Sequence, residues 1–268
     1  MTEQAPKTEA LAAPAAGGAQ TLIDALGYLR SLVVTIPLIY LATIFWGSLS
    51  LFVSFFDQTG HAQHWCSRWW ARTLLGVSRI RVTVKGMENV AADQTCIFAA
   101  NHQSYMDIPV FFGYLPGQFR IMAKSTLFYL PFLGWHLRRS GHMPIERANP
   151  RRAARSLLEA ATHVKTGTRV FIFPEGGRSL DGRLAEFKAG TFLLAIKAGV
   201  PVIPVTVNGT RRVLLFNSWH IRPGRVEVIF HPPIATAGMH SDSAVELSEH
   251  VKRVIATAFD EAAALAAR

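Results

Sequence analysis

The sequence predicts an α/β fold: a mixed sheet flanked by helices, preceded by a hydrophobic N-terminal membrane helix or helical hairpin. Residues 31–56 contain no charged residue, and beyond residue 78 short apolar or alternating runs are interleaved with helical patterns. Strands that alternate with helices are typical of α/β domains. We therefore divide the chain into a disordered Ala/Pro/Gly-rich tail at 1–20, a membrane-associated helical segment at 21–76 and a folded domain at 77–268.

The composition suits one domain with an appendage. The chain has 268 residues, of which 50% are hydrophobic and 17% charged, and its formal net charge is +10. Such a charge indicates anionic partners, whether nucleic acid, anionic lipid or phosphorylated substrates. Cys66 and Cys96 form no CxxC pair, which fits a reducing compartment. His61, His64 and Cys66 lack a second ligand pair, so we predict no metal site.

The apolar run begins after Arg30 and ends before Asp57. As one helix it would be roughly 39 Å long, enough to cross the ~30 Å hydrocarbon layer of a bilayer. A cleaved signal peptide is disfavoured because no small-x-small cleavage site follows, whereas a buried soluble helix stays an alternative. Pro37 and the pair Gly47-Ser48 are expected to kink the helix, which leaves spanning and half-inserted arrangements both open.

Tryptophans and arginines follow the apolar run. Trp65, Trp69 and Trp70 alternate with Arg68 and Arg72, a mixture that suits either the lipid headgroup layer or packing against the domain. Lysine and arginine are denser after the run than before it. The positive-inside tendency then predicts an inner (cytoplasmic) membrane protein whose folded domain faces the cytoplasm.

Six short runs in the folded domain read as strands from their apolar or alternating patterns. They are residues 79–86, 95–100, 119–124, 168–173, 200–207 and 225–230. Asn149-Pro150 is typical of a helix start, which predicts a helix from there to about Lys165. An amphipathic spacing predicts a second helix from about Ser243 to the end of the chain.

A polar cluster follows directly on the second predicted strand, at residues 101–107. In α/β sheets, ligands bind at the carboxyl ends of strands. His102 and Asp107 are five residues apart, so they can meet only if the chain turns between them. Asp107 could then hold one imidazole nitrogen while the other takes a proton from a hydroxyl. As a bare spacing, the pair is equally compatible with a structural histidine.

A second polar loop follows the strand at 168–173. Its glycines allow backbone N–H groups to approach a ligand closely, and Arg178 offers a planar fork suited to phosphate. Glu175 could accept hydrogen bonds from a polyol or fix Arg178. A tight turn with a surface Glu–Arg pair is the alternative.

Together the two loops resemble the glycerolipid acyltransferases, specifically the bacterial 1-acyl-glycerol-3-phosphate acyltransferases of phospholipid biosynthesis. The motifs that carry the resemblance are Asn101-His102-x4-Asp107 and Phe173-Pro174-Glu175-Gly176-x-Arg178-Ser179. Residues 124–134, which begin with Lys124-Ser125 and end with Leu-Pro-Phe-Leu-Gly, are similar to the second motif of the family, and residues 200–205 to its fourth. The resemblance covers about residues 80–210.

The resemblance implies an O-acyltransferase whose catalytic domain is the segment 77–268. His102 would be the general base and Asp107 its orienting partner. The substrate-binding residues implied by the same motifs are Glu175, Gly176, Arg178, Lys124, Asn101 and Ser179. The acyl donor would be acyl-CoA or acyl-acyl carrier protein, the acceptor a lysophospholipid in a membrane, and no metal, prosthetic group or nucleic acid would take part.

One position departs from the family pattern. The third motif usually has threonine after Glu-Gly, and here the residue is Gly177. This leaves lyso-ornithine lipid, another lysolipid or glycerol-3-phosphate open as the acceptor. A non-catalytic basic membrane adaptor is the alternative outside the enzymes. A nucleic-acid binder is disfavoured because aromatic–basic motifs are missing from the sequence, and a serine hydrolase because no G-x-S-x-G is present.

Overall fold

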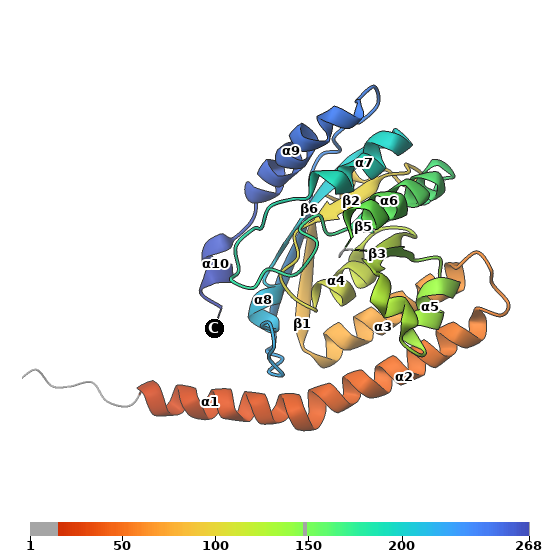
Figure 1. Cartoon of the computed structure of the whole chain (residues 1–268). Coiled ribbons are helices and arrows are strands. Elements are labelled where there is room, and N and C mark those ends of the chain that lie inside the picture. The colour runs from red at the N-terminus through yellow and green to blue at the C-terminus, as the bar shows by residue number, and fades with distance from the viewer. Residues whose placement is uncertain (1–15, 147–148, 268) are drawn as a thin grey trace, which may run out of the picture.

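The computed structural model describes residues 16–146 and 149–267. The predicted tail at 1–20 lies outside these residues except for 16–20, which form the start of helix α1 (Ala16–Arg30). A π-helical turn, Ser31–Thr35, joins α1 to α2 (Ile36–Val53). Figure 1 shows this bent helix running along one side of the molecule, and α3 (His61–Val77) then enters the folded domain.

The irregular turn ends two residues before Pro37, one of the residues expected to kink the helix. Proline has no N–H to donate to the carbonyl of Val33, so the regular helical pattern is interrupted there. Ser31 Oγ hydrogen-bonds to Gly27 O at 2.9 Å and to Ile221 O at 3.1 Å, which fastens the turn to the domain. Residues 21–53 are long and apolar enough to cross a membrane, and few of these side chains are buried.

A seven-stranded mixed sheet forms the centre of the domain. Its strands are β1 (Ile80–Lys85), β2 (Ile97–Ala100), β3 (Arg120–Lys124), β4 (Met143–Ile145), β5 (Val170–Ile172), β6 (Val202–Asn208) and β7 (Gly224–Phe230). Their order is β1-β7-β6-β2-β5-β3-β4. Every neighbouring pair is parallel except β6 and β7. The predicted fold class is therefore confirmed, and each of the six predicted runs overlaps a strand. The three-residue β4 was not predicted.

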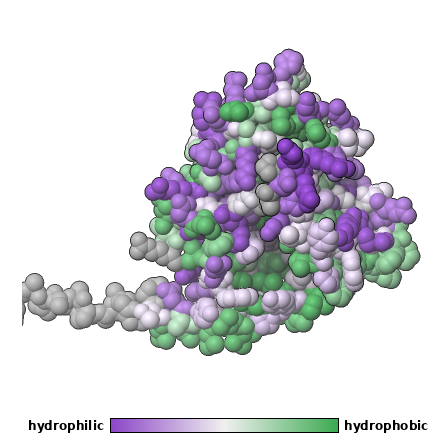
Figure 2. Space-filling view, viewed as in Figure 1, coloured by the Kyte–Doolittle hydropathy of each residue, from purple (hydrophilic) through white to green (hydrophobic). Residues whose placement is uncertain are grey.

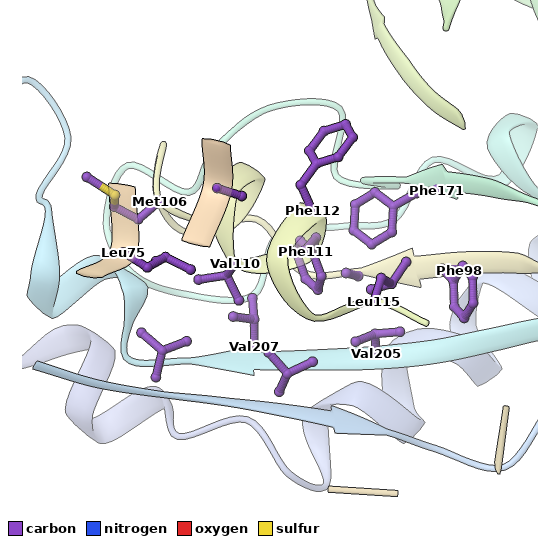
Figure 3. Close-up of a cluster of buried hydrophobic side chains, with 14 of the residues drawn as sticks. Leu75, Phe98, Met106, Val110, Phe111, Phe112, Leu115, Phe171, Val205 and Val207 are labelled. Carbon is purple, nitrogen blue, oxygen red and sulfur yellow. The ribbon is translucent and has the colours of Figure 1, made fainter. Parts of the chain in front are cut away.

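Helices cover both faces of the sheet. Successive residues of β2 point to opposite faces, so Phe98 and Ala100 pack with α3 and α4 (Asp107–Tyr114), while Ile97 and Ala99 pack on the other side. That second face is covered by α6 (Pro150–Lys165), α7 (Ala189–Ala198) and α9 (Ala244–Ala256). Figure 3 shows the first of these cores, in which side chains of α4 lie against those of the sheet.

The remaining helices are short: α5 (Leu133–Arg139), α8 (Thr210–Val213) and α10 (Glu261–Leu265). The prediction for α6 is confirmed, because the side chain of Asn149 accepts hydrogen bonds from the N–H groups of Arg151 and Arg152. The single helix predicted from Ser243 onward is wrong in its continuity. The chain leaves the helix after α9 and starts again at α10, where the Asp260 side chain accepts from Ala263 N.

The turn after β1 depends on Gly86. Its φ is 71°, and a methyl group on its Cα would overlap the carbonyl oxygen of Phe230. We expect Gly86→Ala to lower the free energy of unfolding by about 2 kcal/mol or more, since it combines a left-handed backbone with overpacking against a main chain. Denaturant unfolding in detergent measures this. Gly190→Ala in α7, where the added methyl would meet open space, is the matched control and is expected to be neutral or stabilising.

Candidate active site

The functional side chains gather where the parallel strands end. Strands β2, β3, β4, β5 and β6 run in the same direction, so their carboxyl ends share one edge of the sheet. The polar loop at 101–107 follows β2, and the loop at 173–179 follows the neighbouring strand β5. The N–H of Ser179 donates to the carbonyl of His102 at 2.8 Å, which joins the two loops directly.

His102 and Asp107 meet because the chain turns between them. Nδ1 of His102 lies 2.7 Å from Oδ2 of Asp107, which is fully buried at the start of α4. The same oxygen accepts the N–H groups of Gln103 at 2.7 Å and Ser104 at 2.9 Å. The loop is therefore wrapped around the carboxylate, which fixes the imidazole and leaves Nε2 as the nitrogen available for proton transfer.

An aromatic ring also packs against one face of the His102 imidazole. The imidazole stacks on the ring of Phe173, with 3.8 Å between centroids and 14° between planes. Within the described part of the chain, Nε2 makes no hydrogen bond. A partly buried imidazole with one nitrogen on a carboxylate and the other free is the arrangement that general-base catalysis on a hydroxyl requires.

The carboxylate of Glu175 hydrogen-bonds to two separate segments of the site. Its Oε1 accepts the N–H of His102 at 2.5 Å, and its Oε2 accepts the N–H of Ala185 at 3.2 Å. The side chain is buried, and this burial raises its pKa to about 7, against the two hydrogen bonds that favour the carboxylate. In this arrangement both oxygens of Glu175 brace the site, and its predicted contact with substrate stays a prediction.

The raised pKa of Glu175 makes a pH-dependent contribution to stability. The folded state holds this proton more tightly than the unfolded chain, whose value is near 4.5, so the contribution is present below pH 4.5 and is lost as the pH rises through about 7. We expect the unfolding free energy of the wild type, relative to Glu175→Gln, to decline across that window by up to about 3 kcal/mol. Denaturant titrations of both proteins between pH 4.5 and 8 would show it. A difference that is constant with pH would contradict the assignment.

Arg178 lies between two aromatic rings. Its guanidinium carbon is 3.4 Å from the centroid of Tyr105 and 4.5 Å from that of Phe216. Among the described residues, no carboxylate lies within ion-pair distance of it. A cation that is oriented by stacking yet has no counter-charge is suited to binding an anionic ligand, and a planar guanidinium suits phosphate in particular.

Three other predicted residues take different positions. Asn101 is buried, and both ends of its amide bond the main chain of Val207, at 2.9 Å and 2.8 Å, so it braces β6. Ser179 Oγ accepts the N–H of Gly182 at 3.0 Å and donates to Asp181 at 3.1 Å, so it shapes its own loop. Lys124 is exposed at the end of β3, two strands from β2 and so about 10 Å away.

Gly176 and Gly177 differ in the space that the structure leaves for a side chain. Gly176 has a φ of 76°, and the Nζ of Lys188 lies 2.7 Å from where its side chain would begin. The sequence did not single out Lys188, because it lies nine residues beyond the motif. A Cβ at Gly177 would meet open space, so no close contact requires glycine at this position.

Known proteins of one family resemble this chain. The family model described as Acyltransferase matches residues 81–208, which contain both polar loops. The chain is similar to a 1-acyl-sn-glycerol-3-phosphate acyltransferase of Pseudomonas aeruginosa, at 30% identity over 77% of this chain and 81% of the relative. It therefore belongs to the 1-acyl-sn-glycerol-3-phosphate acyltransferase family.

A solved structure and plant relatives extend the likeness. The crystal structure of the 1-acyl-sn-glycerophosphate acyltransferase PlsC from Thermotoga maritima is 31% identical, with a TM-score of 0.74 over 85% of this chain and 94% of that one. A chloroplast 1-acyl-sn-glycerol-3-phosphate acyltransferase of Brassica napus is 37% identical over 68% of this chain. The chain spans 54% to 58% of the length of this protein and two other photosynthetic relatives.

Proposed function

We propose that the protein transfers a fatty acyl group to the sn-2 hydroxyl of 1-acyl-glycerol-3-phosphate and so forms phosphatidic acid. The observation that carries the proposal is the pairing of His102, with its free Nε2, and Arg178, with no counter-charge among the described residues, on loops joined by a hydrogen bond. The names of the relatives support this choice of acceptor. The donor is acyl-CoA or acyl-acyl carrier protein, and no prosthetic group takes part.

The mechanism follows from the two side chains. The acceptor phosphate binds Arg178, and the free hydroxyl of the glycerol lies at Nε2 of His102. His102 takes the hydroxyl proton as the oxygen attacks the thioester carbonyl, while Asp107 stabilises the imidazolium that forms. The carbon–oxygen bond forms, the carbon–sulfur bond breaks, and the leaving thiolate takes a proton from His102. The ester and a free thiol are the products.

The apolar N-terminal helix is the membrane anchor in this proposal. Its exposed apolar side chains and the tryptophans of α3 support association with the inner membrane, with the catalytic domain on the cytoplasmic side. The acceptor is itself a membrane lipid. A catalytic domain held at the bilayer surface would therefore meet its acceptor without extracting it into bulk water.

The deciding experiment supplies purified, detergent-solubilised protein with lysophosphatidic acid and either acyl-CoA or acyl-acyl carrier protein. We expect phosphatidic acid from at least one donor. No product with either donor would overturn the proposed acceptor. A panel of lysolipids, starting with lyso-ornithine lipid, and glycerol-3-phosphate would then identify the acceptor. A protein inactive on all of them would favour the non-catalytic membrane adaptor.

A further inference from the structure

A segment of the catalytic domain exposes a continuous run of large apolar side chains. It comprises residues 129–135, which run from the end of the 3-10 helix after β3 (Ser125–Tyr129) into the first turn of α5, and we call it the aromatic loop. Five of its seven residues are large, apolar and between 43% and 80% exposed: Tyr129, Leu130, Phe132, Leu133 and Trp135. Single exposed apolar residues are ordinary on soluble proteins, but contiguous patches of this kind mark interaction sites.

The loop is built to hold these side chains outward. Phe132 has φ 61° and ψ −59°, and Leu133 N donates to Pro131 O at 2.7 Å, which together form a γ-turn of the rare, strained type. The next residue is Gly134, where a methyl group would overlap the carbonyl oxygen of Phe128. Strain of this kind costs on the order of 1–3 kcal/mol and persists where the surrounding structure enforces it. The exposure of the Phe132 ring is therefore not the result of a loosely folded loop.

The aromatic loop is continuous with the apolar surface of α2. Helix α5, which begins in the loop, packs on α2 through a hydrogen bond of 2.9 Å between His136 Nδ1 and Ser50 Oγ. Arg139 donates to Ser54 O at 2.9 Å and stacks on the ring of Phe55 at 4.4 Å. Figure 2 shows hydrophobic surface along the lower edge of the molecule, which α1 and α2 form, whereas the surface above it is mixed and mostly hydrophilic.

Cations border this surface, as at a lipid headgroup layer. Arg138 lies over the ring of Tyr129 at 5.9 Å, beside Arg139. In the described part of the chain, neither arginine is paired with a carboxylate. Aromatic side chains bordered by unpaired arginines match the boundary between acyl chains and anionic headgroups.

We propose that the aromatic loop is a second membrane contact, which enters the headgroup–acyl boundary of an anionic bilayer beside α2. It begins five residues after Lys124, which ends β3 at the carboxyl edge of the sheet where the loops of His102 and Arg178 also begin. A lysolipid would then reach the site by lateral movement from the bilayer. This inference rests on the membrane association and acceptor of the proposed function, and it adds where the catalytic domain itself meets the lipid.

The depth of the loop can be measured directly. A nitroxide on Phe132→Cys, in vesicles that contain phosphatidylglycerol, is tested for collisions with oxygen, which partitions into lipid, and with a water-soluble nickel complex. The native Cys66 and Cys96 are buried, so the wild type serves as the labelling blank. Phe45→Cys on α2 is the lipid control and Val245→Cys on α9 the water control, both at exposed positions.

We expect positions 132 and 45 to collide more with oxygen and position 245 more with nickel. If the label at position 132 collides more with nickel, as at 245, while the label at 45 collides more with oxygen, the inference fails and the proposed membrane anchor stands. If the label at position 45 also collides more with nickel, both the inference and the proposed membrane anchor fail.

A kinetic test uses the double variant Phe132→Ser/Trp135→Ser. Its Michaelis constant for lysophosphatidic acid in vesicles, expressed as a surface concentration, is expected to rise about tenfold or more. Its kcat/KM for a short-chain, water-soluble acceptor is expected to stay unchanged, which would show that the site is intact. An equal loss on both acceptors, or no loss on vesicles, would overturn the inference. A wild type inactive on both acceptors would instead overturn the proposed function, independently of the measured depth.

Discussion

Replacement of His102 by alanine is expected to lower kcat for phosphatidic acid formation about 10²–10⁴-fold, with little change in the Michaelis constant of the acceptor. The imidazole is fixed by Asp107 at 2.7 Å and by stacking on Phe173, and its loss removes the proton acceptor of the hydroxyl. Phosphate binding at Arg178 does not use this side chain. Initial rates in detergent, at saturating donor and varied lysophosphatidic acid, separate kcat from KM.

The control for this result is His163→Ala, an exposed histidine on α6 that is expected to leave the rate unchanged. Equal unfolding midpoints of His102→Ala and wild type would show that the fold is intact. Asp107→Asn extends the test, because a neutral amide cannot stabilise the imidazolium and is expected to lower kcat by a similar order. If His102→Ala retained more than a tenth of the wild-type rate, the general-base role would be wrong.

Arg178→Ala is expected to lower kcat/KM for lysophosphatidic acid about 10²-fold, while the Michaelis constant of the thioester donor stays unchanged. The reason is the loss of a charge-assisted contact in a partly enclosed site, where truncating one partner of a charge pair costs 2–5 kcal/mol or more. Arg178→Lys keeps the charge but loses the planar fork and the stacking on Tyr105 and Phe216, so an intermediate loss of about tenfold is expected.

Arg183→Ala is the matched control for Arg178, since it removes an exposed arginine five residues further along the same loop. It is expected to leave both Michaelis constants unchanged. Steady-state kinetics with each substrate varied in turn would make the comparison. An equal loss of affinity for donor and acceptor in Arg178→Ala would contradict the assignment of Arg178 to the acceptor phosphate.

Much of the fold could be predicted from residue patterns because those patterns are local. The strand runs, the N-cap of α6 and the apolar helix depend on residues close together in the chain. Strand β4 was missed because three residues are too few to show a period. The end of α9 was missed because the amphipathic spacing continues past it. Asn208 lies far away in the sequence, and its side chain accepts the N–H of Asp260 at 3.0 Å where the chain turns.

The candidate site could be predicted in part. The spacing of His102 and Asp107 required a turn between them, and the structure has that turn. Glu175 was expected to face a polyol or Arg178, whereas both its oxygens bond main-chain N–H groups from other segments. Asn101 was assigned to substrate, yet both ends of its side-chain amide hydrogen-bond to the main chain of Val207 in β6. In each case the sequence identified a polar side chain but not the main-chain groups with which it forms hydrogen bonds.

By itself, the sequence determined the apolar N-terminal helix, the α/β pattern and the two polar loops, because each is a property of neighbouring residues. Only the tertiary structure decided that β2 and β5 lie side by side, and therefore that His102 and Arg178 share one edge of the sheet. It also decided that Phe216 and Tyr105 enclose Arg178, that Lys188 lies beside Gly176, and that the aromatic loop lies next to α2. The physical reason is that these contacts depend on strand order and chain crossover, which hydrophobic periodicity does not encode.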